Sequence, residues 1–157
     1  MERRHWLVLF GAALAQGCQV FRSSEAAECY ACKRPIHEHS RTVAFENGRS
    51  RVFCCPACAL SERAQTGKPI AVTRLTAYLT GEPLAPENAY VVRGSDVNMC
   101  IRTQDIVSAD KRPADLRYDR CAPSIYAFAQ QSEAVRFARE HGGEVMLFPQ
   151  AAAAFTQ

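Results

Sequence analysis

The sequence lacks the motifs that most often announce catalysis or membrane spanning. It has no Gly-rich phosphate loop, no H-E-x-x-H motif and no G-x-S-x-G nucleophile elbow. The apolar run near the N-terminus, Trp6 to Ala15, is shorter than the about 20 residues that a membrane-spanning helix needs. These absences predict a protein that is not an enzyme and does not span the bilayer.

The chain also lacks a strong charge of either sign. Its 157 residues include 19 Lys and Arg against 16 Asp and Glu. Removing Glu2, Arg3 and Arg4 with an N-terminal leader leaves 17 basic and 15 acidic residues. Because that balance gives no general attraction for polyanions, nucleic acid is not an expected partner.

The N-terminus predicts export. Arg3 and Arg4, the short apolar run and the small residues after it are typical of a secretory signal over residues 1–17. Two cleavage sites fit, the A-x-A sequence Ala13 to Ala15 and the lipobox-like "LAQGC" that ends at Cys18. The second predicts a lipoprotein anchored to the membrane through Cys18, in the periplasm or cell envelope.

Cysteine is what the chain has in plenty, with eight residues. Seven remain after Cys18, so disulfides are a rival to any metal site in an oxidising compartment. A two-cysteine turn, then a hairpin, then cysteines at a helix start is the spacing that places four thiolates around one ion. The candidate ligands are Cys29, Cys32, Cys54, Cys55 and Cys58.

The start of the predicted helix favours these ligands. The positive end of a helix lowers the pKa of nearby thiols, so Cys55 and Cys58 are expected to ionise readily. Either Cys54 or Cys55 could be the fourth ligand, because both spacings to Cys58 can close a site.

The secondary-structure pattern predicts an α+β fold built from two β-β-α-β units. In the first unit, "RTVAFE" and "RSRVF" flank the hairpin signal Asn47-Gly48, and a helix runs from Pro56 to Gly67. In the second, "AYVVRG" and "SIYAFA" are strands, Ser132 caps a helix that ends at His141-Gly142, and "EVMLF" is a strand. The predicted segments are a tether 18–28, a metal-binding unit 29–75, a second unit 76–149 and a tail 150–157.

Several other residues are candidates for lesser roles. His37 and His39 could be auxiliary metal ligands or surface histidines. Cys100 and Cys121 flank the long polar stretch 102–119, a functional loop or surface insertion, and could form a disulfide of about 3 kcal/mol. Alternatively, Cys100 joins Met99 near the metal.

The cysteine segment "CYACKRPI…RVFCCPACAL" resembles the treble-clef-type TRASH and YHS metal-binding modules, and the cysteine-rich N-terminal segment of some copper-exporting P-type ATPases. Most of the remaining chain resembles the NosL family through "AYLTGEPLAPENAYVVRGSDVNM" and "PSIYAFAQQSEAVRFAREHGGEV". The resemblance implies a periplasm-facing lipoprotein that binds Cu(I) and passes it to a client metalloprotein.

Two departures from the NosL pattern affect the expected ligands. The family has a C-G-M sequence whose cysteine and methionine bind copper, whereas this chain has Cys32, Lys33 and Arg34. Met99 matches a family methionine near the end of the "GSDV" strand. A site richer in thiolate suits Cu(I) and also Zn(II).

Two classes of function therefore remain, with a weaker third. The first is a metallochaperone that carries Cu(I) to a client. The second is an interaction module whose cysteines hold a structural Zn(II) ion worth about 10 kcal/mol or more of folding free energy. The third is thiol-disulfide exchange by "CYAC" or "CPAC", which lacks the βαβ context of thioredoxin-like motifs.

Overall fold

The computed structural model describes residues 27–100 and 119–155. The predicted leader, the predicted lipidation site Cys18, most of the predicted tether and nearly all of the stretch 102–119 lie outside these ranges. Within them, no helix is both long and apolar enough to cross a bilayer.

The first sheet is antiparallel, with the strand order β2-β1-β3-β4. Asn47 and Gly48 both have positive φ, 48° and 77°, as a tight hairpin turn requires, and this turn joins the first two strands. Helix α1 follows, begins with a proline and ends at Gly67 in the left-handed conformation. The elements are β1 (Thr42–Glu46), β2 (Arg49–Phe53), α1 (Pro56–Thr66), β3 (Ile70–Thr76) and β4 (Pro83–Leu84).

The second sheet has the order β6-β5-β7, again antiparallel. Its central strand is the first of its unit, as β1 is in the first sheet, so the two units share one topology. The predicted α+β fold with two β-β-α-β units is confirmed. The elements are the 3-10 turn η1 (Pro86–Asn88), β5 (Tyr90–Arg93), β6 (Ile125–Phe128), α2 (Gln131–His141), β7 (Glu144–Leu147) and α3 (Phe148–Ala153).

One local prediction was wrong. The cap of α2 is Gln130 rather than Ser132, because the Glu133 carboxylate accepts the backbone N–H of Gln130 at 3.2 Å and starts the helix two residues earlier. The strand predicted at "AYVVRG" is β5, which ends at Arg93, and Gly94 then turns the chain with φ of 80°.

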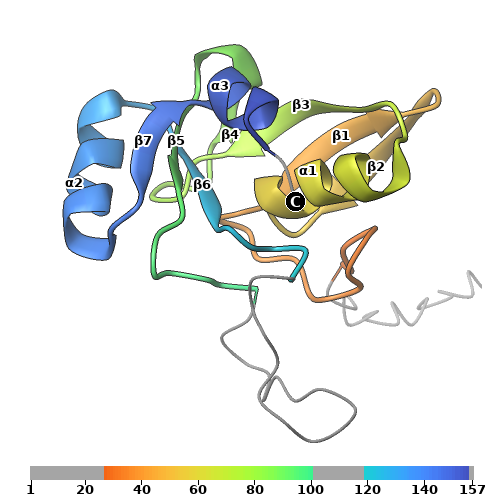
Figure 1. The fold of residues 1–157 in the computed structure, drawn as a ribbon, viewed down its shortest axis with the longest axis horizontal. Coiled ribbons are helices and arrows are strands. Elements are labelled where there is room, and N and C mark those ends of the chain that lie inside the picture. Colours follow the sequence, from red (N-terminus) through yellow and green to blue (C-terminus); the bar gives the residue numbers. More distant parts are fainter. Residues whose placement is uncertain (1–26, 101–118, 156–157) are drawn as a thin grey trace, which may run out of the picture.

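The two units meet side by side, with α2 at one end of the molecule, the tip of the β1–β2 hairpin at the other and α3 near the junction (Figure 1). Tyr78 donates its backbone N–H to the carbonyl of Ala127 at 2.8 Å, and a parallel bridge pairs Ala77 with Ala127. The end of β3 is thereby tied to β6. Aromatic side chains, Tyr78, Tyr126, Phe128 and Phe137 among them, fill a smaller core beneath α2.

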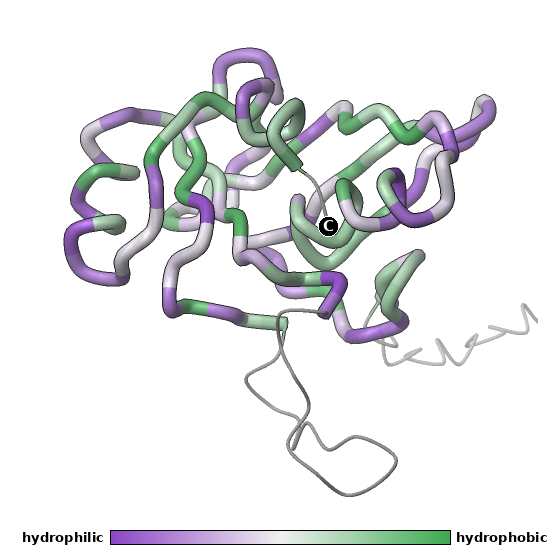
Figure 2. The backbone as a smooth tube through the Cα atoms, viewed as in Figure 1, coloured by the Kyte–Doolittle hydropathy of each residue, from purple (hydrophilic) through white to green (hydrophobic). Residues whose placement is uncertain are grey.

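The larger core extends across both units, and its centre is rich in sulfur. It joins residues of α1, the first sheet, β5, β6 and α3. Hydrophobic residues accordingly line the interior strands, while the hairpin tip between β1 and β2 is hydrophilic (Figure 2). Six cysteines belong to this core, with Cys32 packed against it; the six are Cys29, Cys54, Cys55, Cys58, Cys100 and Cys121.

Candidate metal centre

The first pair of cysteines is held in a tight turn before β1. Cys29 donates its N–H to the carbonyl of Arg34 at 2.9 Å and accepts the N–H of Lys33 at 3.1 Å. Lys33, the residue after Cys32, has a positive φ of 62° within this turn. The N–H of Tyr30 bonds to the carbonyl of Val52 at 2.8 Å, so the turn is fixed against β2.

The second group of cysteines forms the start of α1. Cys55 is the N-cap residue, in extended conformation, and Pro56 and Cys58 follow in the first turn. The helix has no side-chain cap and no acidic residue in that turn. Ser40 donates its hydroxyl to the carbonyl of Cys54 at 2.7 Å, which fixes the backbone just before the helix.

The equivalent positions in the second unit show what these cysteines replace. Seventy-five residues on, Cys55 and Cys58 correspond to Gln130 and Glu133, the capping pair of α2. The sulfurs of α1 therefore occupy the positions from which side chains normally satisfy the first N–H groups of a helix.

A third segment brings two more sulfurs to the same place. Cys100 lies after β5 and Cys121 before β6, and both side chains are buried. The Sγ of Cys121 is 3.5 Å from that of Cys54. The N–H of Cys121 bonds to the Asp119 carboxylate at 2.8 Å, which orients this segment.

All seven cysteines of the described ranges are free thiols, and they form two sets of four that share Cys54. Within each set the Sγ atoms lie within 4.8 Å of one another. The first set contains Cys29, Cys32, Cys54 and Cys58, and the second contains Cys54, Cys55, Cys100 and Cys121.

The sulfur spacing fits a tetrahedral metal ion. For a zinc–sulfur bond of about 2.3 Å, the sulfurs of a regular tetrahedron lie about 3.8 Å apart. The Sγ atoms of Cys29 and Cys58 are 3.6 Å apart, and those of Cys32 and Cys54 are 3.5 Å apart. The donor set is thus suited to metal binding, and its soft thiolates select ions such as Cu(I) and Zn(II).

The pKa values of the thiols differ from the expectation based on the helix dipole. The pKa of Cys55 is raised by its hydrogen bonds with Cys100 and Cys121 and by burial, and the pKa of Cys58 is raised first by its bond with Cys121. The hydrogen bond with Cys32 raises the pKa of Cys29, but bonds with Cys54 and Cys58 outweigh it and lower the value to about 6. Thiol–thiol contacts and burial are the main causes of these shifts.

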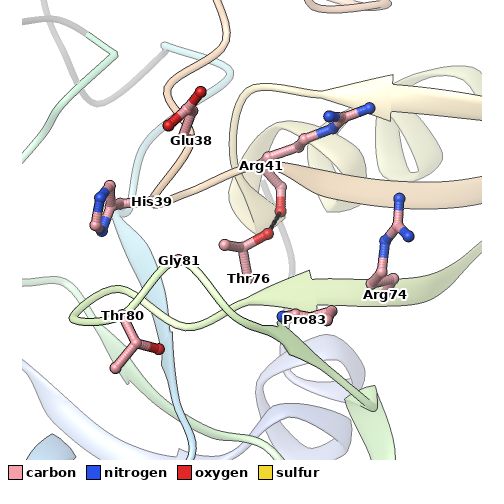
Figure 3. A pocket seen from close by; sticks show the side chains of 8 residues that line it. All are labelled: Glu38, His39, Arg41, Arg74, Thr76, Thr80, Gly81 and Pro83. Carbon is pink, nitrogen blue, oxygen red and sulfur yellow. Dashed lines mark hydrogen bonds between the residues drawn. The ribbon is translucent and has the colours of Figure 1, made fainter.

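The residues considered as auxiliary metal ligands, His37, His39 and Met99, do not belong to either sulfur set of the described residues. Neither His37 nor His39 belongs to a sulfur set among the described residues. His39 bonds through Nδ1 to the carbonyl of Tyr78 at 2.8 Å and lines a separate surface hollow with Arg41 and Arg74 (Figure 3). Met99 packs against the aromatic core beneath α2, and its N–H bonds to the Tyr126 hydroxyl at 2.8 Å.

Cys100 and Cys121, which were considered as a disulfide, are near each other but are not bonded. The two sulfurs do come together, but as free thiols within a set that also contains Cys54 and Cys55. Cys121 belongs to a sulfur set, although the sequence did not identify it as a candidate metal ligand. Its only signal in the sequence was its residue type, because 67 positions separate it from Cys54.

Comparison with known proteins supports the fold. No protein-family model and no curated protein matches the sequence. The structure is similar to the crystal structure of the copper chaperone NosL from Shewanella denitrificans, with a TM-score of 0.54 and 16% identity over 83% of this chain and 90% of that one. The NosL-like fold suggested by the sequence is thereby confirmed.

Proposed function

We propose that this protein is an exported, lipid-anchored metal-binding accessory protein that holds Cu(I) and passes it to a client metalloprotein. The observation that carries the proposal is the first sulfur set, in which three buried thiols meet one that is only half-buried, Cys32. Thiolates bind Cu(I) strongly, and a partner's thiol can reach an ion only where a ligand faces solvent.

The thiol ligands support a role in carrying a metal ion more than a role in catalysis. The reactive side chains that cluster within the described residues are cysteine thiols, and the similar structure is that of a copper chaperone. We therefore propose no enzymatic activity. Turnover of a disulfide substrate by the metal-free protein, abolished by Cys29→Ser, would contradict this part of the proposal.

A closed zinc site is the second candidate, and the tetrahedral sulfur spacing favours it. Four thiolates are a usual structural Zn(II) site. In that case the ion stabilises the fold, and the surrounding domain acts as an interaction module.

The deciding experiment is a competitive titration of the reduced protein under anaerobic conditions, with one chelator specific for Cu(I) and one for Zn(II). A carrier binds Cu(I) tightly and releases it to the competitor without unfolding. Zn(II) that is retained, and whose removal unfolds the protein, supports the structural site instead.

Variants identify the ligands. Cys58→Ser should weaken Cu(I) binding by more than about 100-fold, since even the loss of a residue that merely orients a ligand costs 10- to 100-fold. His39→Ala is the control, because His39 lines a separate hollow. Equal losses in both variants would rule out this ligand set.

Export and anchoring are tested on the protein made in its native host. The expected mature N-terminus is a lipid-modified Cys18, detected by mass spectrometry. Cys18→Ser should release the protein from the membrane fraction, and an unmodified N-terminus after Ala15 would support the alternative cleavage.

A further inference from the structure

The two sulfur sets form one continuous group, because Cys54 belongs to both. Its Sγ lies 3.5 Å from that of Cys32 in the first set. In the second set it lies 3.5 Å from the Sγ of Cys121 and 3.9 Å from that of Cys55. These separations are close to the about 3.8 Å edge of a tetrahedral metal–thiolate site.

The number of sulfurs matches a shared arrangement. Two tetrahedra that share one corner have seven corners, and the described chain brings seven thiols together. A thiolate has enough lone pairs to bind two ions at once. Cys54, at the start of α1 and between the other six, is placed at the shared corner.

The surroundings provide positive charge for such a group. Arg34 approaches the second set, with its Nη1 atom 3.5 Å from the Sγ of Cys121. The uncapped N-terminus of α1 directs its positive end toward Cys55 and Cys58. The helix end lowers the electrostatic cost of burying several thiolates together, and the Arg34 guanidinium, which is ion-paired with Asp119, donates a hydrogen bond to Cys121.

The two sets differ in access to solvent. Every member of the second set is buried, with exposed fractions of 0% for Cys54, 3% for Cys55, 5% for Cys100 and 1% for Cys121. The first set includes the half-buried Cys32. An ion in the second set is therefore shielded from competing ligands, whereas an ion in the first set can be reached through Cys32.

Resting on the proposed function, we propose that the protein binds two thiophilic d10 ions joined through the Cys54 thiolate. The inner ion, on Cys54, Cys55, Cys100 and Cys121, is resident. The outer ion, on Cys29, Cys32, Cys54 and Cys58, is the exchangeable cargo. Disulfide bonds cannot pair all seven cysteines with one another, since an odd number leaves one thiol unpaired.

Cadmium tests the shared sulfur directly. The full chain, reduced and anaerobic, is loaded with 113Cd(II) and observed by native mass spectrometry and 113Cd NMR. Two bound ions and two cadmium resonances in the range of sulfur coordination are expected, split by their mutual coupling through the bridging sulfur. Two uncoupled resonances would overturn the bridge.

Variants separate the two sites. Cys32→Ser should keep one tightly held ion, and Cys121→Ser should keep one ion that a chelator removes. With wild-type protein loaded with Zn(II) or Cu(I), the chelator should remove one equivalent at least tenfold faster than the other. A single rate for both equivalents would overturn the division into resident and cargo ions.

The outcomes also distinguish this inference from the proposed function. One ion per wild-type chain, insensitive to Cys121→Ser, would overturn the second site and leave the carrier role intact. No bound ion, with paired cysteines by mass, would overturn both. The wild-type cadmium measurement stands even where a serine variant fails to fold.

Discussion

Arg34 occupies the position at which the resemblance to NosL places a copper-binding methionine, and it acts on the cluster as a cation. Its guanidinium donates to both carboxylate oxygens of Asp119, at 2.8 and 2.5 Å. Hydrogen bonding to Asp119 raises the pKa of Arg34, so the guanidinium remains charged at any pH at which the protein folds. A thioether ligand is thus replaced by a fixed positive charge beside Cys121.

Replacing this charge should destabilise the fold. In Arg34→Gln, Asp119 keeps a largely buried carboxylate without its partner, so the free energy of unfolding should fall by about 3 kcal/mol. Denaturant titration of the metal-free protein measures the loss. Adding Asp119→Asn should recover part of it, whereas additive losses would show that the two side chains do not act as a pair.

At the scale of the element, α1 is a helix whose N-cap residue is a cysteine. Its N-cap is Cys55, where serine, threonine, aspartate or asparagine is the usual residue. The equivalent residues of α2 cap their helix through side-chain oxygen atoms. The difference between the two units is therefore concentrated in a few positions at one helix terminus.

Cys55→Ser separates capping from metal binding. Serine is a good N-cap, so the metal-free variant should be as stable as wild type to within about 1 kcal/mol. Its rise in melting temperature on adding Zn(II) should be clearly smaller, because one ligand of the second set is lost. An unchanged rise would show that Cys55 is a cap and not a ligand.

The chain just after α2 requires glycine at position 143, because there is no room for a side chain. A Cβ on Gly143 would lie 2.8 Å from Cγ1 of Val92 and 2.9 Å from the carbonyl oxygen of Arg93, and φ there is 96°. Gly143→Ala should cost about 3 kcal/mol or more of stability. The matched control is Gly67→Ala, where nothing lies within 4 Å and the backbone strain alone costs about 1 kcal/mol. Equal losses by thermal unfolding would contradict the steric argument.

At the scale of the whole molecule, the cysteine group lies where both β-β-α-β units contribute to one core. Cys29 and Cys58 come from the first unit, and Cys100 and Cys121 come from the connection between β5 and β6 of the second. The second sulfur set combines Cys54 and Cys55 of the first unit with Cys100 and Cys121 of the second, so an ion bound there should stabilise the junction and not one unit alone.

Metal should therefore raise the stability of the entire described fold in one transition. Free ion at 100 times its dissociation constant should add about 2.7 kcal/mol per site, and the melting temperature should rise with ion concentration. Circular dichroism and the fluorescence of an aromatic residue should report the same midpoint. Two separate transitions, only one of them moved by metal, would show that the units unfold independently.

Much of this architecture could be predicted because its signals are local. Asn47-Gly48 specifies its hairpin, and the spacing from Phe53 to Gly67 recurs from Phe128 to Gly142 in both helices. The meeting of Cys54 with Cys121 could not be predicted in the same way. It depends on how the second unit packs against the first, which no short sequence pattern encodes.

The prediction of the α2 cap was wrong for a related reason. Serine at position 132 is a stronger local signal than the Gln130–Glu133 pair that caps the helix in the structure. Short-range preference identifies candidates for a helix start, but side-chain reach decides among them. The pKa of Cys55 is a similar case, because contacts with the distant Cys100 and Cys121 raise it, opposite to the direction expected from the adjacent helix end.

The unequal helix starts have a consequence for the lifetime of the protein in the cell. The second unit carries its own cap, whereas the first begins its helix on residues suited to an ion. Under the proposed function, scarcity of metal lowers the stability of the whole fold, so the protein opens more readily, and proteases act on such openings. The abundance of the protein would then follow the supply of the ion, without any separate sensor.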